Sequence, residues 1–416
     1  MEAMNHFASP LPLFLANVTR QEWLDIRTLV LLGVVLGILI AAYIIGRALR
    51  RAPESTASPA VVRTFNLRVA AWWMMCTILV AGFLLGYSAT VVLFGLVSFW
   101  ALREFITMTP TRRGDHRTLF WTFFVFTPLQ YFFVARGSEW YGIYTIMIPV
   151  YASLFIPARI AIAGDPKRFL ERVAKIQAGL LICVYALSHA PAVLSLQLTT
   201  SDKQLWVVGT REAPAAAETL VDDGNLDIRP EIPVEPKTGS KVSSPASEKS
   251  STSSKTVAAD PKSQSPALTA PTDASKYIRG SNAGLLFYFV LLVQLNDVFQ
   301  FAWGNLLGRH VIAPSINASR TWEGMIGGAL STMLVGAILW WATPFKMWES
   351  ACMALAIAVM GFAGGMTMSA IKRDRGVKDY GTLVSGHAGV LDRIDSLCFA
   401  APIFFHLTRY FFSDIS

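Results

Sequence analysis

Charged residues are scarce in this sequence. Asp, Glu, Lys and Arg make up 15% of its 416 residues, whereas 53% are hydrophobic. So little charge argues against an ordinary soluble domain and is typical of an integral membrane protein. We therefore predict an all-α, polytopic membrane protein.

Cysteines are few and isolated. The four cysteines each lie alone in apolar sequence, without a CxxC spacing or an adjacent histidine: Cys76, Cys183, Cys352 and Cys398. This absence argues against a zinc site and against a disulfide framework. We expect four buried thiols.

The first 27 residues lack the basic start and the small-residue cleavage site of a signal peptide. We therefore expect the first apolar run to remain in the mature protein.

A formal net charge of +8 would suggest nucleic acid as a partner of a soluble chain. Here, however, Lys and Arg gather in short loops between apolar runs. The positive-inside bias and contact with anionic membrane lipids explain this pattern more simply, so no nucleic-acid partner is expected.

Ten apolar runs approach the roughly 20 residues that a membrane-spanning helix needs. The second and third are the least distinct, because only Gly-Tyr-Ser separates them. The expected spans are 28–46, 69–84, 87–102, 118–135, 141–161, 176–197, 281–301, 324–343, 350–370 and 393–412.

The charges of the loops predict the orientation. Basic residues follow the first, third and fifth spans, which assigns these loops to the cytoplasm. Continued alternation brings 302–323 and 371–392 to the same side and both termini to the other. We predict a multi-pass protein of the cell (inner) membrane, with its active site on the cytoplasmic side.

The segment 201–279 is rich in Ser, Pro, Ala, Lys and Thr and almost free of aromatic residues, apart from a short apolar LWVVG at 205–209. Such a composition predicts a disordered linker. It divides an N-terminal membrane block of about six helices (1–200) from a C-terminal block of four (280–416), to which we assign catalysis.

Acidic residues stand out in the stretch 369–396, SAIKRDRGVKDYGTLVSGHAGVLDRIDS. Asp392 and Asp395 are three residues apart and share a helix face, and Asp392 also suits the positive end of the helix dipole. Together with Asp379 and the glycines of the intervening turn, they indicate a site for a divalent cation. Hard oxygen ligands suit Mg²⁺, which shares its remaining positions with substrate phosphates.

Basic residues surround these carboxylates. Some of them serve the positive-inside rule, but a loop that needs only positive charge would not carry four aspartates. A site that binds a metal with a polyphosphate needs both signs. The bases are Lys372, Arg373, Arg375, Lys378 and Arg393, and His387 is either a solvated turn residue or a phosphate contact.

A second polar group lies at 294–328. Asp297 stands near the end of a span, where an ionisable residue is either a functional candidate or a charge that reaches the interface. Thr321 and Glu323 open the next span and are typical of an N-cap and a first-turn acid.

At these residues the chain resembles the phosphatidate cytidylyltransferase (CDP-diacylglycerol synthase) family. The family pattern S-x-hydrophobic-K-R-x4-K-D-x-G followed by H-G-G-x-x-D-R-x-D is matched over 27 residues, and two upstream elements of the family resemble 297–304 and 317–324. The sequence departs from it at Ala388, for the usual glycine, and at Asn317, Ala318 and Arg320, for the usual Ser, Pro and Lys. The matching positions are Ser369, Ile371, Lys372, Arg373, Lys378, Asp379, Gly381, His387, Gly389, Asp392, Arg393 and Asp395.

The resemblance implies a nucleotidyltransferase that moves CMP from CTP to phosphatidate in phospholipid biosynthesis. It implies Mg²⁺ held by Asp379, Asp392 and Asp395, with Lys378 at the catalytic centre, a monovalent cation as a further option and a homodimer as the assembly. The substrate-binding set that it implies is Lys372, Arg373, Arg393, His387, Ser369, Asp297, Arg320, Thr321 and Glu323.

Two other functions stay open at this point. The departures at 317–320 and 388 allow a divergent paralogue that acts on another lipid phosphate or is inactive. An ionisable residue within a span also fits a transporter or channel. Against this second alternative, the ionisable residues gather at one interface and the two blocks share no matching broken segments.

Overall fold

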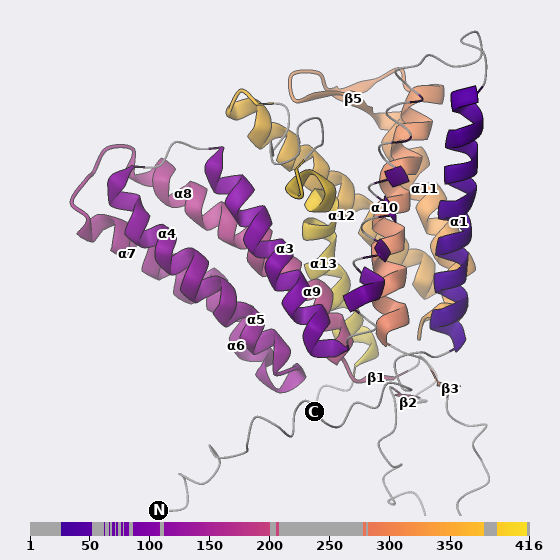
Figure 1. Cartoon of the computed structure of the whole chain (residues 1–416), viewed down its shortest axis with the longest axis horizontal. Coiled ribbons are helices and arrows are strands. Elements are labelled where there is room, and N and C mark those ends of the chain that lie inside the picture. The colour runs from indigo at the N-terminus through magenta and orange to yellow at the C-terminus, as the bar shows by residue number, and fades with distance from the viewer. Residues whose placement is uncertain are drawn as a thin grey trace, which may run out of the picture. The chain divides into compact units, whose positions relative to one another are not determined.

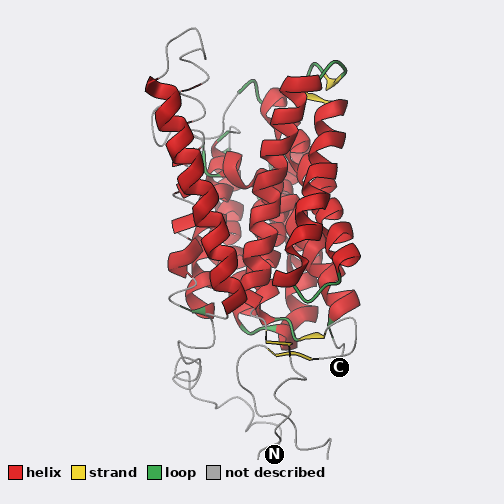
Figure 2. Ribbon diagram, turned by 90° about the vertical axis from the view of Figure 1, so that its right-hand side faces the viewer, coloured by secondary structure: helices red, strands yellow, loops and turns green. Residues whose placement is uncertain are grey.

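The computed structural model describes residues 26–51, 86–108, 112–199, 205–207, 278–279, 282–377 and 389–413, together with isolated positions between 62 and 82. The chain divides into two units, one formed by 1–210 with 275–416 and the other by 211–274. Every described residue belongs to the first unit, which is a bundle of long helices (Figures 1 and 2).

Eight helical segments of the described part are long and apolar enough to cross a membrane. This confirms the predicted fold class, an all-α polytopic membrane protein. They coincide with eight of the ten expected spans. Their ranges are Arg27–Ala48, Tyr87–Thr107, His116–Ala135, Ser138–Ile162, Phe169–Ser195, Asn282–Leu307, Trp322–Ala342 and Met347–Asp374.

The remaining two expected spans differ from these eight. Of the 16 residues 69–84, six lie outside the described residues. The last one forms α13 (Leu391–Phe412), a helix of 22 residues that begins with Asp392, Arg393 and Asp395.

Long helices account for most of the bundle, and their bounds follow the apolar runs. They are α1 (Ile26–Arg51), α3 (Tyr87–Thr107), α10 (Asn282–Leu307), α11 (Trp322–Ile338), α12 (Met347–Asp374) and α13. A 3₁₀ turn, η11 (Leu339–Ala342), extends α11.

Three spans of the N-terminal block change to a π-helix in their middle. Pro128 follows the first of these π segments and Pro149 lies within the second. A proline lacks the N–H that a regular α-helix would use, and neighbouring helices in a membrane tolerate the irregularity. The three spans are α4 (His116–Trp121), η4 (Thr122–Phe126) and α5 (Thr127–Ala135); α6 (Tyr141–Ile146), η6 (Met147–Ala152) and α7 (Ser153–Ile162); and α8 (Phe169–Gly179), η7 (Leu180–Ala186) and α9 (Leu187–Ala192). Short 3₁₀ turns stand beside them: η3 (Arg113–Asp115), η5 (Ser138–Trp140) and η8 (Val193–Ser195).

Two small sheets lie at opposite ends of the bundle (Figure 1). At one end, β4 (Val311–Ala313) and β5 (Asn317–Thr321) form an antiparallel hairpin between α10 and α11. At the other, β2 (Leu205–Val207) pairs antiparallel with β1 (Leu198–Thr199) and parallel with β3 (Ile278–Arg279). We call these the hairpin end and the sheet end. Most of the linker predicted for 201–279 lies outside the described residues.

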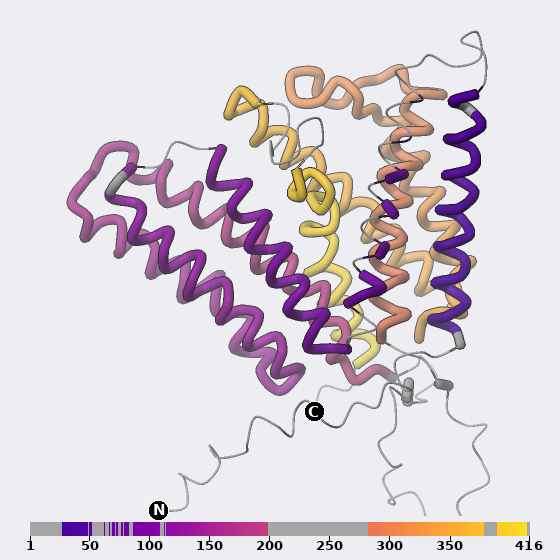
Figure 3. Tube along the Cα trace, in the orientation of Figure 1, coloured from indigo at the N-terminus to yellow at the C-terminus, as the bar shows by residue number. Residues whose placement is uncertain are grey.

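Helix α13 packs against both blocks. It contacts α12 and α10 on one side and α9, η7 and α3 on the other, as the tube trace in Figure 3 also shows. In its core contacts, Phe404 stacks on Phe289 of α10 with ring centroids 4.8 Å apart, and Phe405 packs against Tyr144 of α6. The helix that carries the Asp-Arg-x-Asp motif is therefore held from both sides.

Large apolar side chains on the outside of the bundle stay exposed. Leu96, Leu154 and Leu334 are each more than half accessible, at 64%, 69% and 61%. An apolar surface of this kind suits contact with lipid chains instead of water.

Candidate active site

The first turn of α13 pairs with the last turns of α12. Lys372 Nζ donates a hydrogen bond of 2.8 Å to Asp392 Oδ1, and the two side chains are only 15% and 8% exposed. Burial weakens solvent screening, so this ion pair interacts more strongly than one at a surface. It joins the two halves of the predicted motif, KR at 372–373 and DRxD at 392–395.

A serine bridges two carboxylates one turn further along α13. Ser396 Oγ donates to Asp297 Oδ2 at 2.9 Å and lies 3.4 Å from Asp395 Oδ1. The backbone N–H of Ser396 also donates to Asp395 Oδ1, at 2.7 Å. Asp297 comes from α10, so the structure brings together acids from both polar groups of the sequence.

Close contact of α12 with α13 depends on a glycine. A Cβ atom at Gly364 would lie 2.8 Å from the backbone oxygen of Asp395, closer than such atoms approach in folded proteins. The absence of a side chain at Gly364 therefore lets α12 lie directly against the Asp395 turn.

Arg320 extends from β5 to α10. Its guanidinium donates to Gln300 Oε1 and, at 3.4 Å, to Asp297 Oδ1. A planar guanidinium can contact two acceptors at once in a way that a lysine ammonium cannot. Arg320 thus places a positive charge beside Asp297.

Contacts of Asn317 and Arg373 attach the β4–β5 hairpin to α12. Asn317 Nδ2 donates to Ser369 Oγ at 3.1 Å, and the Ser369 hydroxyl donates to the Gly365 carbonyl at 2.7 Å. Arg373 Nε donates to the Ile316 carbonyl at 3.1 Å. The predicted residues Ser369 and Arg373 therefore also have a structural role.

Thr321 and Glu323 organise the start of α11. Thr321 Oγ1 accepts from the Gly324 N–H at 3.1 Å and is the N-cap of the helix. Glu323 accepts from the backbone N–H groups of Arg309 and His310 at 3.2 Å each, and from the His310 ring. Both residues thus have the helix-start geometry that their positions predict.

Three predicted site residues, Lys378, Asp379 and His387, lie outside the described residues, as does Ala388. Arg393 is half-buried in the first turn of α13, next to Asp392. The roles assigned to Lys378, Asp379, His387 and Arg393 stay predictions.

The carboxylates fit a divalent cation in their donor chemistry. Asp297 and Asp395 both contact the Ser396 hydroxyl, so two carboxylates with hard oxygen atoms lie close together. Asp392 lies one turn before Ser396 on α13. Within the described part of the chain, no three His, Cys, Asp or Glu side chains form a complete metal cluster. The third expected acid, Asp379, falls outside that part.

Sequence reasoning did not identify Glu104 or the partners Gln300 and Ser396. Glu104 of α3 is 3% exposed, and its carboxylate accepts hydrogen bonds from the first backbone N–H groups of α13. Its signal was an acid next to an apolar run, two residues beyond the span expected at 87–102. The partner of Glu104 is 287 residues away, so no local pattern indicates the contact.

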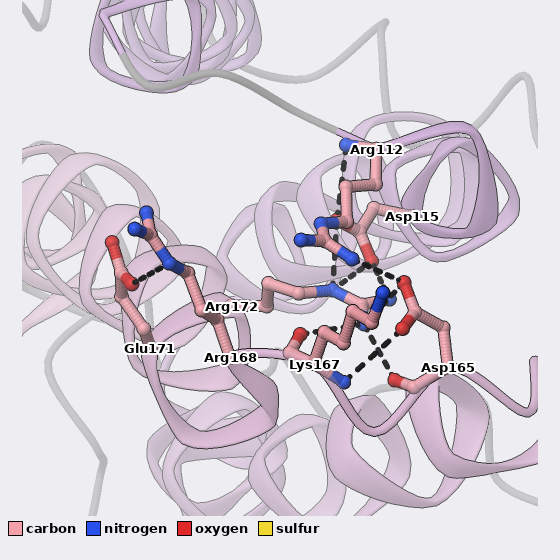
Figure 4. A network of polar contacts seen from close by, with 7 residues as sticks. All are labelled: Arg112, Asp115, Asp165, Lys167, Arg168, Glu171 and Arg172. Carbon is pink, nitrogen blue, oxygen red and sulfur yellow. Dashed lines mark hydrogen bonds and ion pairs between the residues drawn. The ribbon is translucent and has the colours of Figure 1, made fainter.

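A separate polar cluster joins η3 to the loop before α8 and to the start of α8 in the N-terminal block (Figure 4). Arg172 Nε donates to Asp115 Oδ1 at 2.8 Å, and both side chains are almost fully buried. Arg112 donates to Asp165 Oδ2 at 2.7 Å. This bond, with the Lys167 N–H, holds the pKa of the Asp165 carboxyl below its usual value. The contact therefore favours the fold above the unfolded-state pKa of Asp165 and is lost in acid.

The fold and the site define a polytopic membrane protein with paired acids and bases at the hairpin end of its helices. The chain belongs to the cytidylyltransferase family, whose model matches residues 66–411. The predicted family resemblance is confirmed, and with it the prediction of a nucleotidyltransferase enzyme.

Individual relatives fall into two groups. "Uncharacterized protein YnbB" of Escherichia coli (strain K12) is 28% identical over 384 residues, which cover 91% of this chain and 97% of the relative. Proteins named phosphatidate cytidylyltransferase from Staphylococcus haemolyticus (strain JCSC1435) and Staphylococcus aureus (strain COL) are 32% and 33% identical over 127 residues. These matches cover 30% of this chain and 49% of each relative, so the chain aligns with about half the length of these two enzymes.

Proposed function

We propose that this protein transfers CMP from CTP to phosphatidate, giving CDP-diacylglycerol and pyrophosphate for phospholipid biosynthesis. One observation carries the proposal: acids and bases of three separate segments, α10, β5 and the α12–α13 pair, meet at the hairpin end of a membrane bundle. The relatives named phosphatidate cytidylyltransferase share part of the chain with it.

The reaction is an in-line substitution at phosphorus. An oxygen of the lipid phosphate attacks the α-phosphorus of CTP, a new P–O bond forms, and the bond to the β-phosphate oxygen breaks to release pyrophosphate. No covalent enzyme intermediate is needed, so the protein has to align the two phosphates and stabilise the leaving charge.

The side chains divide into two roles. Lys372, Arg373 and Arg393 bind phosphate oxygens, together with Lys378 and His387, and Arg320 keeps Asp297 in place through its guanidinium. Ser369, Thr321 and Glu323 shape the substrate site through the hairpin and the start of α11.

Asp379, Asp392 and Asp395 are the proposed Mg²⁺ ligands, and Asp297 completes or orients the set. When bound, Mg²⁺ would neutralise phosphate charge and bring the two substrates together. A monovalent cation beside it, and a homodimer as the assembly, are further parts of the proposal.

The substrates suggest where the site faces. Phosphatidate stays in the bilayer, whereas CTP is dissolved in the cytosol, so we place the hairpin end at the cytoplasmic face of the cell (inner) membrane. The basic loops of the sequence support the same side. The expectation of four buried thiols is wrong for Cys352, which is exposed, and for Cys76, which is partly exposed. In a chain that lacks these two thiols, a cysteine introduced as Asp374→Cys should react with an impermeant maleimide from the inside alone, and labelling only from outside would contradict this orientation.

Another lipid phosphate is the main alternative acceptor. The departures at Asn317, Ala318, Arg320 and Ala388 support it, as does a nearly full-length relative whose name states no substrate. Phosphatidate is favoured because the relatives whose names state a substrate name this one. Membership of an enzyme family argues against a transporter.

The test is CMP transfer in isolated membranes. Membranes with the protein receive CTP labelled at its α-phosphate, Mg²⁺ and phosphatidate, and labelled CDP-lipid is measured. Asp392→Asn should lower the rate about 10²-fold or more, since it removes charge from the centre of the site. Asp374→Asn is the matched control: this acid is 67% exposed and pairs with Arg375, so its rate should stay near wild type.

Each outcome has a clear meaning. Label in a different CDP-lipid alone would favour the divergent alternative. No labelled product from the wild type, across several lipid phosphates, would refute the proposed function.

A further inference from the structure

Helix α13 begins without a capping side chain of its own. Val390 is at its N-cap position, and its side chain has no acceptor for the first N–H groups, so only its backbone carbonyl accepts, from the Arg393 N–H at 2.9 Å. A helix leaves its first four N–H groups without intrahelical partners, and such groups are costly when buried. Leu391, the first residue of α13, is fully buried.

The missing cap comes from another helix. Glu104, in the last turn of α3, accepts from the Val390 N–H at 3.1 Å with one carboxylate oxygen and from the Leu391 N–H at 2.9 Å with the other. The indole N–H of Trp100, one turn earlier on α3, donates to Glu104 at 3.2 Å. A carboxylate at this point also interacts favourably with the positive end of the α13 dipole.

The contact sets the geometry of the motif helix. Glu104 fixes both the axial position and the direction of the first turn of α13, and Asp392 follows Leu391 directly. Asp395 lies one turn later and takes its position from the same turn. A displacement of this turn would therefore move the acids relative to Lys372 on α12 and Asp297 on α10.

We propose that Glu104 is a positioning residue for the cytidylyl-transfer site, and that the N-terminal block takes part in this site through it. The inference rests on the proposed function. Residues that hold metal ligands in place without touching the metal typically change affinity or activity 10- to 100-fold when they are replaced. Glu104 has such a place with respect to Asp392 and Asp395.

Three variants test the inference. Glu104→Ala removes both acceptors, and Glu104→Gln keeps the length of the side chain and one acceptor oxygen. Ser98→Ala is the matched control, because Ser98 is also fully buried on α3 but bonds to the Tyr131 hydroxyl and not to α13.

Two measurements are made on the full-length protein. Hydrogen–deuterium exchange of a peptide covering 389–397 should speed up in Glu104→Ala, because the Val390 and Leu391 amides lose their acceptors, and stay at the wild-type rate in Ser98→Ala. In the transfer assay, the half-saturating Mg²⁺ concentration of Glu104→Ala should rise about tenfold. Glu104→Gln should recover part of both effects, and it carries the test if the alanine variant does not fold.

Unchanged exchange in Glu104→Ala would overturn the inference. Faster exchange with an unchanged Mg²⁺ dependence would overturn it as well, since the cap would then serve the fold alone. If the wild type makes no CDP-lipid, the proposed function is wrong but the role of Glu104 can still be tested. The measurement is then the change in unfolding temperature that Mg²⁺ alone produces. A smaller shift in Glu104→Ala than in the wild type then supports the inference, and an equal response overturns it.

Discussion

Arg320 contacts Asp297 through its guanidinium, and it stands where the family pattern has a lysine. Its guanidinium reaches Gln300 and Asp297 together, and a Cβ atom at Gly365 would lie 3.2 Å from its Nη2 atom. The arginine therefore fills a narrow space between β5, α10 and α12. A guanidinium suits this space because both acceptors, on Gln300 and Asp297, lie within its reach.

Removal of this guanidinium should weaken the site. A hydrogen bond to a charged group contributes roughly 1.5–3 kcal/mol, so Arg320→Met should lower CMP transfer about 10- to 100-fold. Arg320→Lys keeps the charge, and its transfer rate should lie between those of the wild type and Arg320→Met. The measurement is the rate in membranes, with Arg309→Met on the exposed loop as the control, and equal rates for Arg320→Met and wild type would exclude this role.

The buried pair of Asp115 and Arg172 predicts a different result. Asp115→Asn should destabilise the N-terminal block by about 3–5 kcal/mol, because it leaves a buried guanidinium without its counter-ion. Thermal unfolding in detergent measures this loss. Arg168→Gln is the control, since Arg168 is 73% exposed and its pair with Glu171 is long, at 3.8 Å. Equal unfolding temperatures for Asp115→Asn and Arg168→Gln would show that the buried pair does not stabilise the fold.

Among the elements, α10 and α11 pack closely where Gly328 faces Gln300. A Cβ atom at Gly328 would lie 2.5 Å from Gln300 Cγ and 2.9 Å from its backbone nitrogen. The two helices can approach because this position has no side chain. Gln300 in turn contacts Arg320, so helix packing and the site share a residue.

Gly328→Ala should therefore affect stability and transfer together. The added methyl group forces α10 and α11 apart at a cost of about 1–3 kcal/mol, as is usual for overpacking. Gly33→Ala on α1 is the control, because nothing lies within 4 Å of a Cβ atom there. A wild-type unfolding temperature for Gly328→Ala would show that the interface adapts without loss.

The elements also show what the sequence could predict. Apolar runs of span length predicted eight helices with ends at most seven residues from those observed, because burial in lipid leaves the backbone few choices. The hairpin β4–β5 was not predicted, since Val311–Ala313 and Asn317–Thr321 carry no distinctive strand pattern. The hairpin also contacts α12 through residues far apart in the sequence, such as Asn317 and Ser369, which are 52 residues apart.

The candidate site divides in the same way. The motif spacing predicted that Lys372 and Asp392 belong together, and the structure pairs them. Two contacts were not predicted, because they join segments that are far apart in the sequence. Ser396 and Asp297 are 99 residues apart, and Glu104 and Val390 are 286 residues apart. Neither of these contacts produces a local sequence signal.

For the whole molecule, α13 couples the two membrane blocks. Its first turn depends on α3, its middle packs on α10, and Tyr141 of α6 contacts His406 near its end. The two blocks therefore cannot separate without moving the helix that carries the Asp-Arg-x-Asp motif.

The sheet end has a consequence for the length of the chain. Because β2 and β3 pair side by side, the residues that flank the segment 208–277 lie close together. Loop-closure entropy changes by only about 0.6 kcal/mol for each doubling of length. Replacing 211–274 by a flexible Gly/Ser segment of about 14 residues, enough for a parallel crossover, should keep the unfolding temperature and CMP transfer near wild type. A large loss of stability or of CMP transfer would mean that the segment contributes to the bundle. If both are kept, the length of the segment can vary without a change in the enzyme.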